Sequence, residues 1–142
     1  MHSVTFVLLR PPIANLNRAT IDAVIQRYRL NEMNYDPSWR YDYWTAGDGL
    51  IADAETAAAV GVAGDEDYAQ NVCFVSRIGG RYTPFNIVTP DGTWHGLFDF
   101  GWKMMERDTP AGREAYARWS AHAAEVLAAY PDCVAVEIDT HS

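Results

Sequence analysis

The sequence predicts an α+β fold: a mostly antiparallel sheet of four to five strands with two helices on one face. Alternating apolar residues at 2–9 and 133–140 are typical of strands. Segments 20–30 and 110–129 have the 3.6-residue period of amphipathic helices. A proline-aspartate-glycine turn at 90–92 separates two further strand-like segments, which indicates a hairpin. The order of these elements approximates the ferredoxin-like arrangement with an inserted excursion.

The first half of the chain contains a strand, a helix and the excursion. Segment 2–9 is expected to be buried on one face and partly covered on the other, because both alternating sets contain apolar residues. Asn17 or Thr20 caps the following helix. Residues 52–70, rich in alanine, glycine and acidic residues, form the excursion, with a weak helix near 54–60. The other expected elements are a loop at 31–40 and strands at 41–45 and 72–75.

The second half begins with the hairpin at 83–97, which reads TPFNIVTPDGTWHGL. Pro90 presets the backbone for the turn, and Gly92 accepts a positive φ. Segment 98–107 is rich in aromatic residues and methionine but has no clean period. Thr109-Pro110 is a helix-start signal, with threonine at the N-cap and proline at the first helical position. The 142 residues are therefore expected to form a single domain, 1–142.

Composition limits the classes of partner. The net charge is −8, which disfavours direct binding to nucleic-acid phosphates. No apolar run reaches membrane-spanning length and no signal peptide is visible, so the bacterial cytoplasm is the expected location. Cys73 and Cys133 have no metal-type spacing and are expected to be buried free thiols.

The sequence contains an aspartate-aromatic segment (Asp42-Tyr43-Trp44), a Gly-Gly-Arg element, a TPDGxWH hairpin, a following Gly101-Trp102, a Trp-bearing helix and a C-terminal Asp-x-His (Asp139-Thr140-His141). This set of motifs resembles a family of small uncharacterised bacteriophage and actinobacterial proteins. The resemblance covers roughly residues 35–142 and implies a phage or prophage gene, without an activity. This chain departs from the pattern after Trp44: Gly47-Asp48-Gly49 replaces Gly-Gly-Arg, which occurs instead at 79–81.

Candidate catalytic residues lie in the last strand. Glu137, Asp139 and His141 alternate, so their side chains share one sheet face. If His95 reached the same place, two imidazoles and two carboxylates would suit a divalent metal or a general acid and base. His95, Asp139 and His141 are the candidate catalytic residues, and Glu137 joins them as a candidate metal ligand. The alternative is the solvated face of an antiparallel sheet.

A candidate binding surface combines aromatic, methionine and charged residues. Such residues are frequent at protein interfaces, although aromatic residues and methionine also fill cores. Gly79-Gly80-Arg81 suits either a turn or an anion contact. The candidates are Asp36, Trp39, Arg40, Asp42, Trp44, Arg81, Phe98, Phe100, Trp102 and Met104.

The preferred function is that of a small acidic phage-type accessory protein that binds and inhibits a host or defence macromolecule. No nucleophile or metal motif is recognised, so binding without a cofactor is favoured over catalysis. The expected partner is a protein or nucleoprotein, with no direct nucleic-acid contact and no membrane. The first alternative is a metal-dependent or acid/base enzyme on a phosphorylated or nucleotide substrate. The second is a small-ligand-binding or sequestering domain that uses an open sheet face.

Overall fold

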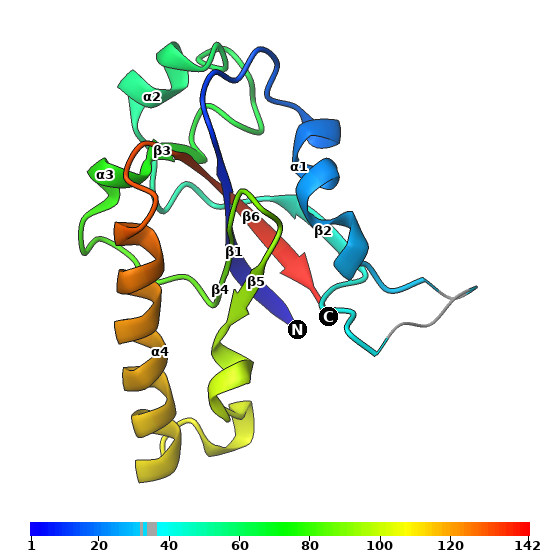
Figure 1. Cartoon of the computed structure of the whole chain (residues 1–142), viewed down its shortest axis with the longest axis vertical. Helices are drawn as coiled ribbons and strands as arrows, with labels where there is room; N and C mark the ends of the chain where they lie inside the picture. The colour runs from blue at the N-terminus through cyan, green and yellow to red at the C-terminus, as the bar shows by residue number, and fades with distance from the viewer. Residues whose placement is uncertain (32, 34–36) are drawn as a thin grey trace.

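The computed structural model describes residues 1–31, 33 and 37–142, and these form an α+β fold around a mixed six-stranded sheet (Figure 1). The strands are β1 (His2–Leu9), β2 (Tyr43–Ala46), β3 (Val72–Phe74), β4 (Asn86–Val88), β5 (Trp94–Gly96) and β6 (Val134–His141). The helices are α1 (Arg18–Ile25), α2 (Ala54–Ala59), α3 (Val75–Ile78) and α4 (Pro110–Ala128), with 3₁₀ turns η1 (Gln26–Tyr28), η2 (Leu97–Phe100) and η3 (Met104–Glu106).

The sheet order is β2-β6-β1-β4-β5, and β3 pairs with the other end of β6. β1 and β4 are parallel, whereas the other pairings between these strands are antiparallel. In a split βαβ arrangement another strand separates the two parallel strands. Here β4, the first strand of the hairpin, lies directly beside β1, so the order differs from the ferredoxin-like one at this point. The long connection between them, which contains α1 to α3, returns to the end of the sheet at which β1 begins.

The prediction that both long helices share one sheet face is wrong, because α1 and α4 pack on opposite faces (Figure 1). The alternation within β1 explains the difference. Both alternating sets of β1 contain large apolar residues, and each set requires its own cover to leave water. The α1 side includes Val7, Leu9, Ile21, Ile25 and Ile138, and the α4 side includes Phe6, Leu8, Ile87, Trp119 and Val126.

The expected caps of both long helices are confirmed. Asn17 Oδ1 accepts the backbone N–H of Thr20 at 3.1 Å, and Thr109 Oγ1 accepts that of Gly112 at 3.1 Å. The α4 helix is anchored by Trp119, which is fully buried and donates its indole N–H to the carbonyl of Pro84 at 2.9 Å. This bond ties α4 to the start of the hairpin. The hairpin, the excursion helix at 54–59 and the strand at 72–74 also form where the sequence predicts them.

Both cysteines are buried free thiols, as expected, and burial raises the pKa of each. Across residues 1–31, 33 and 37–142, no helix has the length and apolar character needed to cross a bilayer.

Candidate functional site

The polar stripe of β6 faces the α4 side of the sheet, as the alternation predicts, but its three members have different surroundings. Glu137 is opposite Phe6 in the β1–β6 register, and His141 is opposite His2. Glu137 is buried, whereas Asp139 and His141 are only partly covered. The stripe is therefore neither a uniformly solvated face nor one continuous site.

Glu137 binds a loop rather than a ligand. The carboxylate, in a residue only 1% exposed, accepts the backbone N–H groups of Asp48 at 2.7 Å, Leu50 at 2.7 Å and Ile51 at 3.2 Å. Gly47 lies directly against it, since a Cβ there would be 2.5 Å from Glu137 Oε2. The Gly47-Asp48-Gly49 turn thus wraps a buried carboxylate, and Glu137 is a structural residue.

His141 is held by Asp42 and Tyr43, at the beginning of the neighbouring strand β2. Its Nδ1 lies 2.8 Å from Asp42 Oδ1, and its ring stacks on Tyr43 with ring centroids 4.6 Å apart and planes 13° apart. The hydrogen bond to His141 lowers the pKa of Asp42. Asp42 was predicted as a binding residue; in the structure it orients the imidazole of His141.

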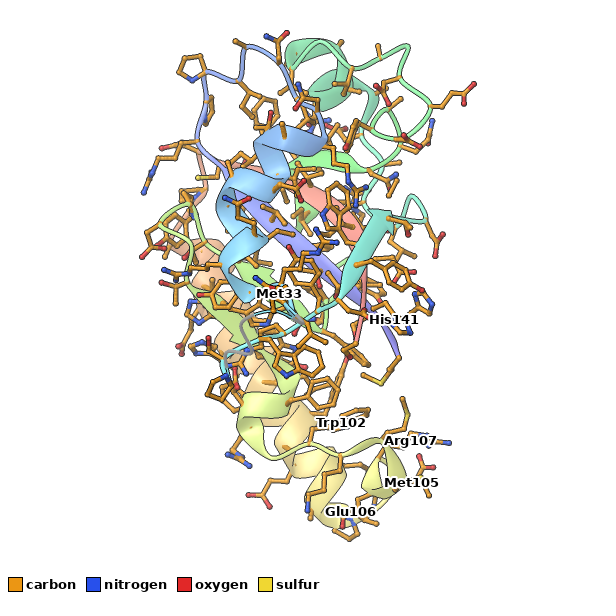
Figure 2. The ribbon with its side chains drawn as sticks, turned by 90° about the vertical axis from the view of Figure 1, so that its right-hand side faces the viewer. Met33, Trp102, Met105, Glu106, Arg107 and His141 are labelled. Atoms are coloured by element: carbon orange, nitrogen blue, oxygen red, sulfur yellow. The ribbon has the colours of Figure 1, made fainter. Side chains whose placement is uncertain are left out.

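Asp139 pairs with His2, at the start of β1. His2 Nδ1 lies 3.2 Å from the Asp139 carboxylate. The His2 and His141 rings meet edge to face, with centroids 4.9 Å apart. We name the group His2, Asp42, Tyr43, Asp139 and His141 the terminal histidine cluster. His141 is labelled in Figure 2, on the right-hand side of the molecule. In the sequence, the alternation of His2 with Val4 and Phe6 indicates which sheet face His2 is on. Only the strand register identifies Asp139 as its partner.

His95 lies elsewhere and pairs with a helix residue. Its Nδ1 is 3.0 Å from His122 Nε2 of α4. Burial, and then the neighbouring His122, lower the pKa of His95. His122 lies 27 residues along the chain from His95, so this pair also depends on tertiary packing.

The register separates His95 from His141. Across the sheet, His95 is aligned with Ile87 and, through it, with Phe6 of β1. His141 is aligned with His2 of β1, which lies four residues before Phe6. Three strand spacings of about 4.8 Å and four residues of about 3.3 Å place the two backbones about 19 Å apart. Two ligands of one zinc ion must be close neighbours. The structure therefore keeps the candidate catalytic residue His95 apart from Asp139 and His141, which lie in the same cluster.

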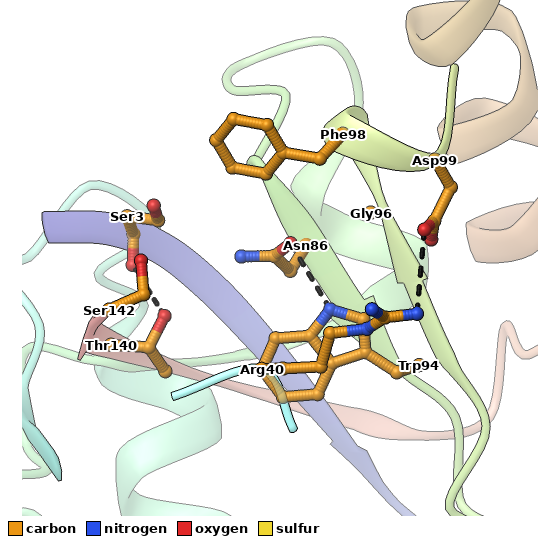
Figure 3. Close-up of a pocket in the computed structure, with 9 residues that line it drawn as sticks. All are labelled: Ser3, Arg40, Asn86, Trp94, Gly96, Phe98, Asp99, Thr140 and Ser142. Carbon is orange, nitrogen blue, oxygen red and sulfur yellow. Dashed lines mark hydrogen bonds and ion pairs between the residues drawn. The ribbon is translucent and has the colours of Figure 1, made fainter. Parts of the chain in front are cut away.

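A small pocket opens on the other face of the sheet (Figure 3). Its volume is about 60 Å³, enough for a water molecule or the tip of a side chain. Thr140, Asn86 and Trp94 contribute to its wall, and Asn86 accepts the Trp94 indole N–H at 3.2 Å. Arg40 and Asp99 form an ion pair of 3.4 Å at its edge. The remaining lining residues are Ser3, Gly96, Phe98 and Ser142.

Several residues of the predicted binding surface are structural instead. Trp44 is 3% exposed and donates its indole N–H to Asp22 at 2.8 Å. Trp102 is 6% exposed and belongs to the α4-side core. Arg81 donates to the carbonyls of Ile78, Ala52 and Ile51, so it holds the excursion against the 79–81 turn. Trp39 and Phe100 are half-buried, and Asp36 lies outside the described residues.

Three of the seven large apolar residues that are exposed in the described part of the chain lie in one segment. Phe98 is 45% exposed, Met104 40% and Met105 91%. All three lie in the connection between β5 and α4, which we name the η2–η3 segment (97–109). Met105 projects beside Glu106 and Arg107 at the lower end of Figure 2. The sequence shows that the η2–η3 segment is apolar, but it does not show which of its side chains face solvent.

Within the described part of the chain, no three His, Cys, Asp or Glu residues are grouped as ligands for a metal ion. No protein-family model, curated protein or solved structure matches the chain, so its function must be argued from these local arrangements.

Proposed function

We propose that the chain is a binding protein that contacts a macromolecular partner through the η2–η3 segment and inhibits it. In its specific form, the partner is a host or defence protein, or a nucleoprotein complex. The observation that carries the proposal is the exposure of Phe98, Met104 and Met105 within one short connection. Large apolar side chains that gather on a surface rimmed by charges are typical of protein interfaces.

The segment is pre-organised for binding. Phe98 packs edge to face on the buried Trp102, with ring centroids 5.5 Å apart. Arg118 of α4 donates to the carbonyl of Phe100 at 3.0 Å, and Thr109 donates to that of Glu106 at 2.6 Å. A segment already held in place loses little conformational entropy when it binds. Methionine adds a flexible, polarizable surface that adapts to the partner.

The pocket extends this surface toward the sheet. Phe98 belongs to the η2–η3 segment and also lines the pocket. The Arg40 guanidinium beside it is able to receive a carboxylate or amide from the partner. The net charge of −8 favours a partner whose surrounding surface is basic.

Affinity capture with matched variants tests the proposal. The protein and its Met105→Ala and Phe98→Ala variants are immobilised and exposed to lysate of a bacterial host. Met105→Ala removes a side chain that is almost fully exposed, so folding stability should change by less than about 0.5 kcal/mol. A specific partner should bind the wild-type protein, and its affinity should fall roughly 5- to 30-fold in the variants, as for interface hot spots.

Leu50→Ala is the matched control, because Leu50 is also 40% exposed but lies in the loop around Glu137. It should retain the partner. The proposal fails if no protein is enriched by the wild-type chain, or if the Phe98 and Met105 variants retain the partner as well as the control does. Inhibition is then measured as the partner's own activity, with and without the wild-type protein.

A further inference from the structure

Two histidines face one another across adjacent strands in the terminal histidine cluster. His2 of β1 lies directly opposite His141 of β6, on the same sheet face. Their ring centroids are 4.9 Å apart, with planes at 64°. The side chains are accessible from solvent, 56% exposed for His2 and 31% for His141. Both rings are therefore accessible to an ion from solution.

Each imidazole is oriented by its own carboxylate. His2 Nδ1 lies 3.2 Å from Asp139, and His141 Nδ1 lies 2.8 Å from Asp42. A carboxylate at Nδ1 favours the proton on that nitrogen and leaves the Nε2 lone pair as the free donor. Histidines that bind metals in proteins commonly have such a carboxylate behind them, because it fixes the tautomer and the ring orientation. Tyr43, stacked on His141, further restricts that ring.

The spacing of the rings fits two ligands of one ion. A nitrogen about 2.1 Å from the metal places the centre of its ring about 3.2 Å from it. Two such ligands at angles of roughly 90–109° have ring centres about 4.5–5.3 Å apart. The observed separation of 4.9 Å lies inside this range. The register of β1 and β6 thus sets the two ring centres at a spacing compatible with a shared ion.

We propose that His2 and His141 form a two-histidine site for a divalent transition-metal ion of the zinc, nickel and copper class. Imidazole nitrogens suit these ions. Asp139 and Asp42 orient the ligands, and water or a bound partner occupies the remaining coordination positions. The site is independent of the η2–η3 segment, so it stands or falls separately from the proposed function.

The second histidine pair of the chain provides an internal comparison. His95 and His122 are linked directly, nitrogen to nitrogen at 3.0 Å. Their hydrogen bond uses one nitrogen of each ring, and none of the described hydrogen bonds to a carboxylate involves either ring. The ring centres are similarly far apart in the two pairs, 4.9 Å and 5.1 Å. In the terminal pair each ring contacts a carboxylate, whereas His95 and His122 contact each other.

Titration calorimetry with nickel or zinc chloride at pH 7.5 tests the site on chelator-treated, tag-free protein. The wild-type chain should bind one ion. His2→Ala and His141→Ala should each lower the affinity at least tenfold. Asp42→Asn should lower it about 10- to 100-fold, because loss of an orienting carboxylate has effects of that size.

His122→Ala is the control and should leave the affinity within twofold of the wild type. Circular dichroism of each variant establishes that it is folded, and His2, exposed at the start of β1, is the substitution expected to disturb folding least. The proposal is overturned if wild-type protein shows no saturable binding up to 1 mM ion (about −4 kcal/mol). It is equally overturned if His122→Ala abolishes binding, or if Asp42→Asn and His2→Ala leave it unchanged.

Discussion

Replacing Glu137 by glutamine tests the role of the buried carboxylate in holding the 47–51 loop. The native carboxylate accepts three backbone N–H groups, from Asp48, Leu50 and Ile51. Glutamine keeps one acceptor oxygen but replaces the other with an N–H₂ donor. One N–H of the loop then faces a donor instead of an acceptor, and the remaining bonds lose their ionic character. Hydrogen bonds to charged groups contribute about 1.5–3 kcal/mol each, so we expect a loss of about 2–4 kcal/mol in the free energy of unfolding.

Such a loss is large compared with the total stability of about 5–15 kcal/mol for a typical domain. For a chain of this size it corresponds to a decrease of about 8–16 °C in Tm. Urea denaturation followed by circular dichroism measures the change, and amide hydrogen exchange at Asp48, Leu50 and Ile51 locates it. Exchange at these three amides should accelerate more than in the strands.

Asp139→Asn is the matched control, two residues along the same face of β6. Its carboxylate pairs with a histidine that is 56% exposed, so its removal should cost less than about 1 kcal/mol. The reasoning is refuted if Glu137→Gln destabilises the protein by less than the control does. It is also refuted if the loop amides exchange at the wild-type rate in the glutamine variant.

Two further predictions concern the His95 pair and the start of α4. Because the pKa of His95 is lowered from its ordinary value of 6.5, the unfolded chain binds a proton more readily than the native chain. Stability should therefore fall as the pH decreases below about 6.5; urea midpoints at pH 7.5 and 5.0 measure this, and a His95→Asn variant with an equally steep profile would contradict it. In Gly112→Ala the new Cβ would lie 2.1 Å from the carbonyl oxygen of Glu106, so we expect a loss of about 1–3 kcal/mol from overpacking. An unchanged Tm in this variant would show that the η2–η3 segment moves aside freely.

Local signals in the sequence predicted the individual elements well. Thr109-Pro110 begins α4 as expected, because an N-cap hydroxyl and a proline at the first position act within one helical turn. The hairpin forms around Pro90 and Gly92 for the same local reason, with Gly92 at a φ of 83°. These features depend on residues close together in the chain, so the sequence alone was sufficient.

Arrangement across the sheet was predicted less well. The apolar residues on both faces of β1 already implied two covering layers, but the predicted order placed both helices on one side. The partner of Asp139 could not be found from spacing, because His2 lies 137 residues away and meets it only through the β1–β6 register. The sequence correctly placed His95 and His141 on the same sheet face. They lie on different strands and at different positions along those strands, so they do not meet. Alternation identifies a face, whereas register identifies neighbours.

The position of β6 in the sheet has a consequence for how the protein is made. β6 pairs with β1, β2 and β3, and residues 134–141 are translated long after the other three strands. Until residues 134–141 leave the ribosome, β1 has no antiparallel partner. The apolar side chains of β1, β2 and β3 then have no β6 to pack beside. Pairing of such distant segments is slow compared with local helix formation. A nascent chain interrupted before β6 would therefore expose unpaired strand edges, which are the substrates that chaperones and proteases recognise.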